Sequence, residues 1–470
     1  MLSFLALLAL AAGPPGGLVG REGTGFVLDG HPFPAVGVNC YYLMVNAASP
    51  SQRWVVDEVL DDAAYFGATV VRTWAFHDGP DGWNALQTSP GVYEESVLKG
   101  LDHVIKEAKE RNLRLLLTLV NNWNDYGGMN QYVEWSPTAG AHDDFYSDPA
   151  CREMYRAHAA KLLTRVNSFT GVAYRDDPAI FGWELANEPR AESKGRAVLD
   201  AWIAEMAAHV KSVDPRHLLT TGSEGFYGPA EAARNPQSWM ATRGVDFIAN
   251  HAHAAIDFAS FHSWPDHWSM DRAQTTSWVR NHFEEAERSI GKPVLLGEYG
   301  KEQPIATRNE SFRDAFDALL GELKPESSSG GMLLWMLYHN ASRDYDGFGV
   351  YHPSPVHAST VSLLREAHGE VAAAIAPVVA PRFLRADSTC DGRANLTDAV
   401  HTLEHLFREG PPSCCAEAAD ANGDGRVDLT DPVFTLFFQF AGGSPPPPPY
   451  PQCGAAPAGA GCEPAPGCSA

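Results

Sequence analysis

Two glutamates, Glu188 and Glu298, each follow a short apolar run that is typical of a buried strand. The first run, Phe181–Ala186, leads into an asparagine and Glu188, after which Pro189 stops regular strand pairing. The second run, Pro293–Gly297, comes directly before Glu298. Carboxyl groups at the tips of two buried strands suit cleavage of a glycosidic bond, because one protonates the leaving oxygen while the other attacks or stabilises the sugar carbon.

Other side chains at predicted strand tips can support this chemistry. Arg72 can hold one glutamate ionised through its charge and hydrogen bonds, which suits a nucleophile. A glutamate in a drier place, without a close cation, keeps its proton and can act as the acid. Asn187 can bond a sugar hydroxyl, and His262, poised near neutral pH, can tune a carboxyl group. The tips also carry Asn121, Asn122, Trp123, Trp264 and Trp335, the last of which offers a flat face to a sugar ring.

These side chains need a scaffold that brings many strand ends together. Short apolar runs alternate with amphipathic helical stretches through residues 22–376. The predicted strands are Pro34–Tyr42, Thr69–Phe76, Leu113–Val120, Ile180–Ala186, Leu218–Ser223, Phe258–Ser263, Pro293–Tyr299 and Gly331–Leu337. The predicted helices are Gln52–Phe66, Tyr93–Arg111, Pro149–Ser168, Gly195–Val213, Met270–Ile290, Ser311–Leu323 and Val356–Ile375. This alternation predicts an α/β fold, a (β/α)8 TIM barrel with a doubly wound sheet as the alternative, and both bind ligands at the carboxyl ends of their strands.

Composition narrows the class of ligand. The 470 residues carry a formal net charge of -23, which repels phosphate backbones and makes nucleic acid an unexpected partner. A neutral substrate is not hindered. With 44% apolar and 10% aromatic residues, the chain can fill one large barrel domain and a small second module.

The first twelve residues are nearly all apolar, and Ala9-Leu10-Ala11 gives a small-x-small cleavage pattern. We interpret residues 1–12 as a signal peptide rather than a disordered terminus, since the run is too short to span a bilayer. We predict no membrane span elsewhere. The protein is therefore expected to be secreted, with an extracellular or cell-surface location.

Cysteines are distributed unevenly. Cys40 and Cys151 are isolated in the long first region, and we expect both to be small buried residues rather than a bridge. The other six are Cys390, Cys414, Cys415, Cys453, Cys462 and Cys468. Their density in a small exported module predicts disulfides, whose pairing the sequence leaves open.

The barrel region from Gly25 to Ala376 resembles the endo-β-1,4-mannanases of glycoside hydrolase family 5, which are retaining barrel enzymes. The motifs that carry the resemblance are VNCYYLM at 38–44, VRTWAF at 71–76, NNWNDYGGM at 121–129, WELANEP at 183–189 and GEYG at 297–300. The NNW and YGG triplets are more similar to mannanases than to the cellulases of the same family.

The resemblance implies random hydrolysis of β-1,4-mannosidic bonds in mannan, glucomannan or galactomannan, with no cofactor for catalysis. It implies that Glu188 is the acid/base and Glu298 the nucleophile, with carboxyl groups about 5–5.5 Å apart. The implied substrate-binding and supporting residues are Arg72, Asn121, Trp123, Asn187, His262, Trp264 and Trp335. Another endo-β-1,4-glycanase, such as a glucanase, and a non-catalytic carbohydrate-binding protein are the alternatives.

One position departs from the family pattern. The family commonly has a tyrosine two residues after the histidine, in contact with the nucleophile, whereas this chain has Trp264 after His262. An indole has an N–H donor but no hydroxyl. We also consider Trp123, Trp135 and Trp268 as stacking platforms for further sugars, with core packing as the alternative.

A repeat follows the predicted linker at residues 377–384. Two twelve-residue segments that begin at Asp387 and Asp420, 33 residues apart, place oxygen ligands at positions 1, 3, 5, 9 and 12 and glycine at position 6. This spacing is typical of calcium loops. The predicted ligands are Asp387, Thr389, Asp391, Asn395 and Asp398 in the weaker first loop and Asp420, Asn422, Asp424, Asp428 and Asp431 in the second. A pair of acidic turns without metal is the alternative.

The duplication, with Asp rather than Glu at position 12, resembles a dockerin. We therefore predict a small α-helical dockerin-like or EF-hand-like calcium module at residues 385–443, followed by a proline-rich, cysteine-containing tail at 444–470. The resemblance implies a cohesin-like or cell-surface partner, although the module could serve only as a spacer or anchor.

Overall fold

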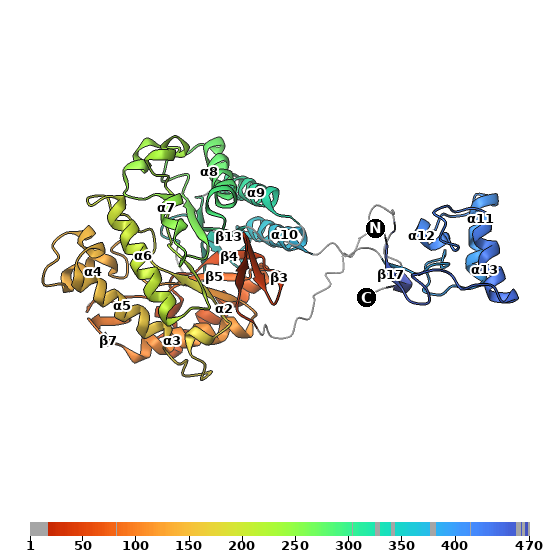
Figure 1. Ribbon diagram of the computed structural model, residues 1–470. Helices are drawn as coiled ribbons and strands as arrows, with labels where there is room; N and C mark the ends of the chain where they lie inside the picture. Colours follow the sequence, from red (N-terminus) through yellow and green to blue (C-terminus); the bar gives the residue numbers. More distant parts are fainter. Residues whose placement is uncertain are drawn as a thin grey trace. The chain divides into compact units, whose positions relative to one another are not determined.

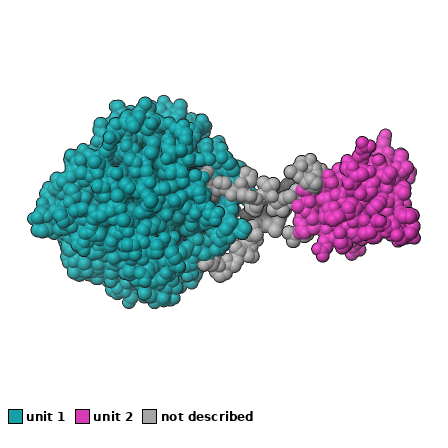
Figure 2. Space-filling view, viewed as in Figure 1, with its two compact units in different colours: residues 1–376 teal, residues 377–470 magenta. Residues whose placement is uncertain are grey.

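The computed structural model describes residues 17–80, 82–302, 304–324, 330–339, 344–376, 382–413, 415–456, 462 and 466–468. The chain divides into two compact units, residues 1–376 and residues 377–470 (Figure 2). The predicted signal peptide at 1–12 lies outside the described residues. Within the described ranges, no helix is long and apolar enough to cross a membrane.

Eight parallel strands form the centre of the first unit. They are β4 (Ala35–Asn39), β5 (Val70–Trp74), β8 (Arg114–Thr118), β9 (Ile180–Glu184), β10 (Leu218–Thr220), β11 (Ala259–Ser263), β12 (Val294–Gly300) and β13 (Gly330–Trp335), paired in the order β10-β9-β8-β5-β4-β13-β12-β11. The two outer strands also meet, since Asp257 N–H donates to Leu219 O at 2.8 Å and Thr220 Oγ1 to Phe258 O at 2.9 Å. This closed arrangement confirms the predicted (β/α)8 barrel.

The strands form because their residues are buried on both faces. Every residue of β4, β5, β8, β9 and β12 is buried, and such parallel strands are expected to be continuously apolar apart from special positions. The observed strands are shorter than most of the predicted runs. For example, β10 ends at Thr220 rather than Ser223, because the chain turns at Gly222, where φ is +77°.

Helices surround the strands on the outside (Figure 1). They are α1 (Leu43–Ala47), α2 (Arg53–Tyr65), α3 (Glu95–Glu110), α4 (Gly128–Trp135), α5 (Pro149–Leu163), α6 (Arg196–Val213), α7 (Phe247–Ala252), α8 (Arg272–Glu285), α9 (Ile305–Glu322) and α10 (Ala358–Ile375). Single 3-10 turns cover Pro50–Gln52, His142–Tyr146, Tyr174–Asp176, Pro229–Arg234 and Ser238–Thr242, and a π turn covers Ala286–Ile290. The seven predicted helices are present with shifted ends, and α1, α4 and α7 are additional.

A small antiparallel sheet closes the amino end of the barrel. It contains β1 (Gly20–Glu22), β2 (Gly25–Leu28) and β3 (His31–Pro32). Phe26 packs edge to face against Phe181 and Phe258, with ring centroids 5.4 and 5.5 Å apart. The amino end of the barrel interior is thus apolar, which leaves the carboxyl end for polar side chains. Short pairs, β6 (Gln87–Ser89) with β7 (Val92–Tyr93) and β14 (Leu337–Tyr338) with β15 (Val350–Tyr351), complete the first unit.

The second unit contains α11 (Leu396–Arg408), α12 (Ala416–Ala419) and α13 (Thr430–Ala441). A short antiparallel pair joins β16 (Arg382–Phe383) to β17 (Gly454–Ala455). The predicted linker is therefore too long at its carboxyl end, since Phe383 and Leu384 are buried in this unit. Residues 377–381 lie outside the described ranges.

The predicted tail is partly integrated into the second unit. Disulfides join Cys415 to Cys462 and Cys453 to Cys468, and Tyr450 packs against Phe438 with ring centroids 5.6 Å apart. These links hold the segment around β17 against the helices. Cys414 lies outside the described residues. Cys40 and Cys151 are free and buried, as predicted.

Candidate active site

Arg72 on β5 organises the carboxyl end of the barrel. Its side chain is fully buried, and its guanidinium lies 2.5 Å from Oε1 of Glu184 and 2.6 Å from Oε1 of Glu298. It also donates to the Oδ1 atoms of Asn187, at 2.7 Å, and Asn39, at 3.0 Å. An arginine remains charged in such a place and offers several donors in a fixed fork. The expected pairing of Arg72 with a glutamate is present, and Glu184 is a second partner.

Glu298 on β12 receives hydrogen bonds on both carboxylate oxygens. Arg72 donates to Oε1, and Trp264 Nε1 donates to Oε2 at 3.2 Å. The indole therefore occupies the contact that the family commonly gives to a tyrosine hydroxyl. Glu298 is only 2% exposed.

Glu188 lies just beyond β9, where its φ of +52° is in the left-handed region. Non-glycine residues in this region are strained, and such strain is concentrated at functional sites. Trp123 Nε1 donates to Glu188 Oε2 at 2.7 Å, and His262 Nδ1 lies 2.8 Å from Oε1. Both partners were expected near the site, although their bonds to this glutamate could not be predicted.

His262 differs from expectation in its protonation. The side chain is completely buried, and this burial lowers its pKa below the usual value for histidine. The imidazole is therefore neutral at neutral pH instead of titrating there. Its Nδ1 lies 2.8 Å from Oε1 of Glu188, within hydrogen-bond distance of the carboxyl group.

The two glutamates differ in their immediate partners. Burial raises the pKa of both carboxyls above the usual glutamate range. Arg72 opposes this rise at Glu298 through a direct hydrogen bond. At Glu188 the charge of Arg190 opposes it from a distance, and the direct partners are Trp123 and His262. Glu298 is thus the better anion, and Glu188 the better proton donor.

The distance between the glutamates is short. One oxygen of Glu188, one oxygen of Glu298 and one nitrogen of His262 all lie within 4.8 Å of one another. Inverting glycosidases need about 6.5–9.5 Å between carboxyl groups to fit a water molecule, whereas retaining ones need about 5–5.5 Å. The observed spacing fits the retaining arrangement.

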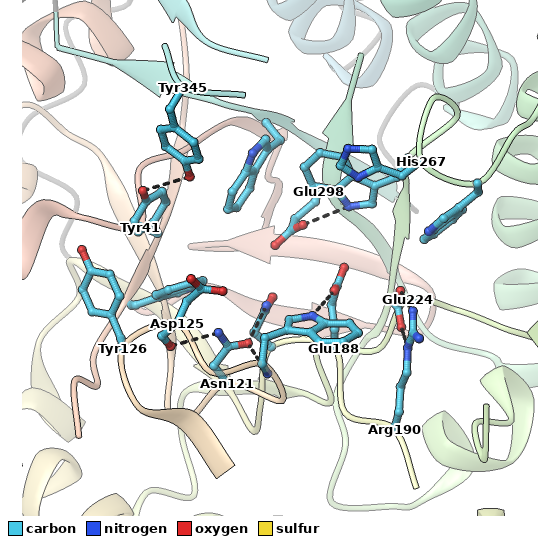
Figure 3. Close-up of a pocket in the computed structure, with 16 residues that line it drawn as sticks. Tyr41, Asn121, Asp125, Tyr126, Glu188, Arg190, Glu224, His267, Glu298 and Tyr345 are labelled. Carbon is cyan, nitrogen blue, oxygen red and sulfur yellow. Dashed lines mark hydrogen bonds and ion pairs between the residues drawn. The ribbon is translucent and has the colours of Figure 1, made fainter. Parts of the chain in front are cut away.

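A pocket of about 410 Å³ opens over these glutamates (Figure 3). Its walls are largely aromatic, formed by Tyr41, Trp74, Trp123, Tyr126, Trp264, Trp268, Trp335 and Tyr345. Trp335 stacks on Tyr41 at an interplanar angle of 10°, and the hydroxyls of Tyr41 and Tyr345 lie 3.2 Å apart. Flat apolar rings beside polar groups are well suited to sugars. Trp135 does not line the pocket and packs against Tyr132.

Asn121 and Asn187 are also placed as predicted. Asn187 Nδ2 donates to Asn121 Oδ1 at 3.0 Å, while Arg72 holds the oxygen of Asn187. Since an amide nitrogen carries two hydrogens, one remains to donate to a sugar hydroxyl. Asn122 lines a neighbouring hollow instead of this pocket.

Sequence reasoning missed Glu184, Glu224 and Arg190. Arg190 Nε donates to Glu224 Oε2 at 2.5 Å (Figure 3). The guanidinium of Arg190 also lies 4.9 Å from the ring centre of Trp123. Burial, and then the charge of Glu188, raise the pKa of Glu224 to about 7. A signal was present, because Glu184 interrupts an apolar strand and Glu224 follows β10, much as Glu188 follows β9.

Comparison with known proteins agrees with this geometry. A profile of the family described as GH family 5 β-mannosidase-like matches residues 17–347. The chain belongs to this glycoside hydrolase family. The mannan endo-1,4-β-mannosidase 1 of Oryza sativa subsp. japonica is 44% identical, with 73% of this chain and 83% of the relative covered. The protein of the same name from Solanum lycopersicum is 43% identical, with 73% of this chain and 89% of the relative covered.

Solved structures of the family show the same barrel. The endo-1,4-β-mannanase from Rhizomucor miehei is 32% identical, with a TM-score of 0.68 over 75% of this chain and 99% of that structure. The endo-β-1,4-mannanase from Thermotoga petrophila is 33% identical, with a TM-score of 0.65 over 72% of this chain and 77% of that structure. These four proteins each cover 72–75% of this chain, so about a quarter of it has no counterpart in them.

Proposed function

We propose that this chain is a mannan endo-1,4-β-mannosidase, which hydrolyses internal β-1,4-mannosidic bonds in mannan, glucomannan or galactomannan with retention. The observation that carries the proposal is the pair Glu188 and Glu298, with oxygens within 4.8 Å of each other at the base of an aromatic pocket. The names of the rice and tomato relatives support the choice of mannan over other β-glycans.

The geometry supports a separate role for each glutamate. Glu298, held as an anion by Arg72 and Trp264, attacks the anomeric carbon of the bound sugar. Glu188 gives its proton to the departing oxygen, and a glycosyl ester of Glu298 is formed. Glu188, now ionised, takes a proton from water, whose oxygen attacks the same carbon and releases Glu298. Two inversions give net retention, and no cofactor takes part in either step.

Activity on defined polysaccharides tests this function. Wild-type protein should release short oligosaccharides from mannan and glucomannan much faster than from cellulose, and NMR should show the β-anomer as the first product. Glu298→Ala and Glu188→Ala should each lose at least about a hundredfold in kcat with an unchanged circular dichroism spectrum, since general acid catalysis alone contributes that much. Cellulose as the preferred substrate, α-anomeric first products, or an active Glu298→Ala variant would contradict the proposal.

An activated leaving group separates the roles of the glutamates. An aryl β-mannoside with a good leaving group departs without protonation, so Glu188→Ala should still form the glycosyl ester and then accumulate it. Mass spectrometry of the intact protein should detect this adduct on Glu188→Ala but not on Glu298→Ala. An adduct on the Glu298→Ala chain would show that the nucleophile is another residue.

For the second unit we propose calcium binding by the two repeat loops. The loops share one hydrogen-bond pattern, in which the first aspartate accepts from the backbone N–H groups at positions 5 and 6. The last aspartate accepts from those at positions 3 and 9. The end carboxylates, Asp387, Asp398, Asp420 and Asp431, are all at most 3% exposed.

The types of residue in these loops fit a calcium ion. Burial raises the pKa of Asp387 to about 6, and the neighbouring carboxylate of Asp398 adds to the rise. Such crowding of acids is relieved by a bound cation. Among the described residues, no three acidic side chains of one loop converge within 4.8 Å, so Asp424 and Asp428 would move inward on binding. The expected ligands remain those predicted from the sequence.

A protein partner for this unit is also a proposal. The exposed apolar residues Leu396, Val400 and Phe407 on α11 recur 33 positions later as Leu429, Val433 and Phe440 near and on α13. Each is at least 44% exposed. We propose that this repeated face docks a cohesin-like partner after export of the chain.

Titration of a purified cohesin module into the full chain tests the docking. Binding in calcium that is lost in EDTA and in the Val433→Asp, Phe440→Asp double variant would support it. Equal heats of binding for the wild type and the double variant would contradict the proposed docking. Secretion is tested by recovering the protein from the culture medium and sequencing its amino terminus. The mature chain should begin after residue 12.

A further inference from the structure

A hollow on the outside of the barrel, here called the outer hollow, is separate from the active-site pocket. It measures about 660 Å³ and shares no lining residue with that pocket. Its walls come from Tyr65 at the end of α2, from residues 352–355 after β15, and from the first half of α10. Cavities of about 300–1,000 Å³ commonly bind small ligands, and the hydrolytic mechanism makes no use of this one.

The walls of the outer hollow are held in place before any ligand binds. His368 Nδ1 on α10 lies 2.9 Å from the carbonyl oxygen of Phe66, directly after α2. The backbone N–H of Tyr351 donates to His357 Nδ1 at 2.8 Å, which closes the turn at 352–356. A preformed cavity costs little conformational entropy on binding.

Arg365 gives the outer hollow a positive charge. Its guanidinium lies 4.3 Å from the ring centre of Tyr65, and its Nη1 donates to the hydroxyl of Tyr65 at 3.0 Å. Within the described ranges, Arg365 forms no ion pair with a carboxylate. A guanidinium that rests on an aromatic ring keeps other N–H donors free, and their planar fork matches a carboxylate. The arginine is therefore placed to receive an anionic group.

The surroundings of Arg365 also favour an anion. The nearby carboxylate of Asp62 does not line the outer hollow, and its Oδ1 lies 2.6 Å from Nδ1 of His352. The ring of His352 stacks on Tyr65, with centroids 4.8 Å apart. The outer hollow further adjoins the first turns of α10, and the amino end of a helix carries a partial positive charge.

The rest of the lining suits a sugar ring. Pro353, Pro355 and Val361 are apolar, and the hydroxyls of Ser354 and Ser362 have no hydrogen-bond partner in the part of the chain that the structure describes. A sugar offers C–H groups to such apolar walls and hydroxyls that can both donate and accept. A polyanion is disfavoured, because the chain has a net charge of -23. A single carboxylate on a neutral carbohydrate fits these conditions best.

We propose that the outer hollow binds one uronic acid unit carried as a branch on an otherwise neutral polysaccharide. Arg365 pairs with the carboxylate, Ser354 and Ser362 bond the hydroxyls, and the C–H face of the ring packs on the prolines. The protein is thereby held on a carboxylated polysaccharide while its cleft stays free. This binding goes beyond the proposed hydrolysis and does not depend on it.

Calorimetric titration of the full chain with two forms of one polymer tests the inference. The first form is glucuronoxylan, a neutral backbone with isolated glucuronic acid branches. The second is the same polymer after its carboxyl groups have been reduced to alcohols, which removes the charge and keeps the rings. Wild-type protein should bind the first form about tenfold or more tightly than the second, as expected for hydrogen bonds to a charged group.

Arg365→Gln should bind both forms equally and weakly, and its fold should be retained because Arg365 is exposed. Arg280→Gln is the matched control, since it removes the same charge from an exposed position on α8, outside the outer hollow. It should bind like the wild type. Both variants should hydrolyse mannan at the wild-type rate, because neither residue lines the active-site pocket.

Three results would overturn the inference. They are equal affinity of the wild type for the two forms of the polymer, unchanged binding by Arg365→Gln, and an equal loss in Arg280→Gln. Inorganic phosphate that displaces the polymer as effectively as free glucuronate, at equal ionic strength, would also overturn it by showing a general anion site. Loss of hydrolysis in Glu298→Ala with binding retained would support it, since the two sites then act independently.

Discussion

The indole N–H of Trp264 lies 3.2 Å from Oε2 of Glu298, at the contact that a tyrosine hydroxyl commonly makes in this family. The ring is held by parallel stacking on His267, with centroids 5.3 Å apart, and by the edge of Phe348 at 4.9 Å. Gly300 makes room for it, since a Cβ there would lie 2.4 Å from Cζ3 of the indole. The wider side chain thus reaches the same carboxylate with a donor that does not ionise.

Trp264→Phe should move the acid limb of the kcat/KM profile to higher pH. The substitution removes a hydrogen bond that favours the anionic form of Glu298, so the pKa of the nucleophile rises and a higher pH is needed to ionise it for attack. At low pH, kcat/KM of this variant should be about tenfold or more below that of the wild type, because a hydrogen bond to a charged group contributes about 1.5–3 kcal/mol. Trp264→Tyr should restore much of the activity if the donor is what matters, whereas equal losses in both variants would indicate a packing role.

Trp123→Phe should affect the opposite limb. Trp123 Nε1 donates to Glu188, which must be protonated in the first step. Without this donor the ionised form of Glu188 is less favoured, its pKa rises, and the base limb of kcat/KM should extend to higher pH. A shift of the acid limb instead would exchange the roles given to the two glutamates.

Arg72→Met should destabilise the first unit by about 3–5 kcal/mol and abolish activity. The variant leaves Glu184 and Glu298 buried without their cation, and breaking a buried ion pair typically costs this much. Denaturant unfolding of the full chain measures the change. Arg272→Met, which removes an exposed arginine paired with Asp314, should leave the unfolding curve nearly unchanged. Equal stability of the two variants would show that the buried network contributes little.

The barrel and the positions of its glutamates were predictable from local patterns. A strand buried on both faces is a continuous apolar run, and the residue that follows it must lie at the carboxyl end of the sheet. Glu188 lies just beyond β9 and Glu298 lies near the carboxyl end of β12, so their convergence needed only the fold. The left-handed φ of Glu188 and the bonds from Trp123 and His262 depend on loops whose paths no local pattern specifies.

Residues with distant partners were harder to predict. Glu184 is part of an apolar run in the sequence, and only the folded barrel shows that Arg72 neutralises it. The role of Arg190 depends on Glu224, 34 positions away. In the second unit, the composition of the tail predicts an irregular segment. Its actual structure depends on the disulfide from Cys453 to Cys468 and on the pairing of β16 with β17, which composition does not reveal.

The stability of the second unit should depend on pH in opposite ways with and without calcium. Burial raises the pKa of Asp387 from 3.8 to about 6, so without calcium the folded loop holds a proton that the unfolded chain releases. In EDTA, stability should therefore be highest at low pH and be lost as pH rises through about 6. Calcium requires the ionised carboxylates, so its stabilising effect should increase over the same interval.

Calorimetry of the full chain at about pH 4 and about pH 7, on either side of this interval, measures both effects as the Tm of the second unit. The expected result is a calcium-induced rise in Tm that is larger at neutral pH, and a Tm in EDTA that is lower at neutral than at acidic pH. Asp387→Asn has no carboxylate to ionise at the first position of its loop, so it should flatten the pH dependence in EDTA and reduce the calcium shift. A Tm that is the same with calcium and EDTA at neutral pH would contradict metal binding by these loops.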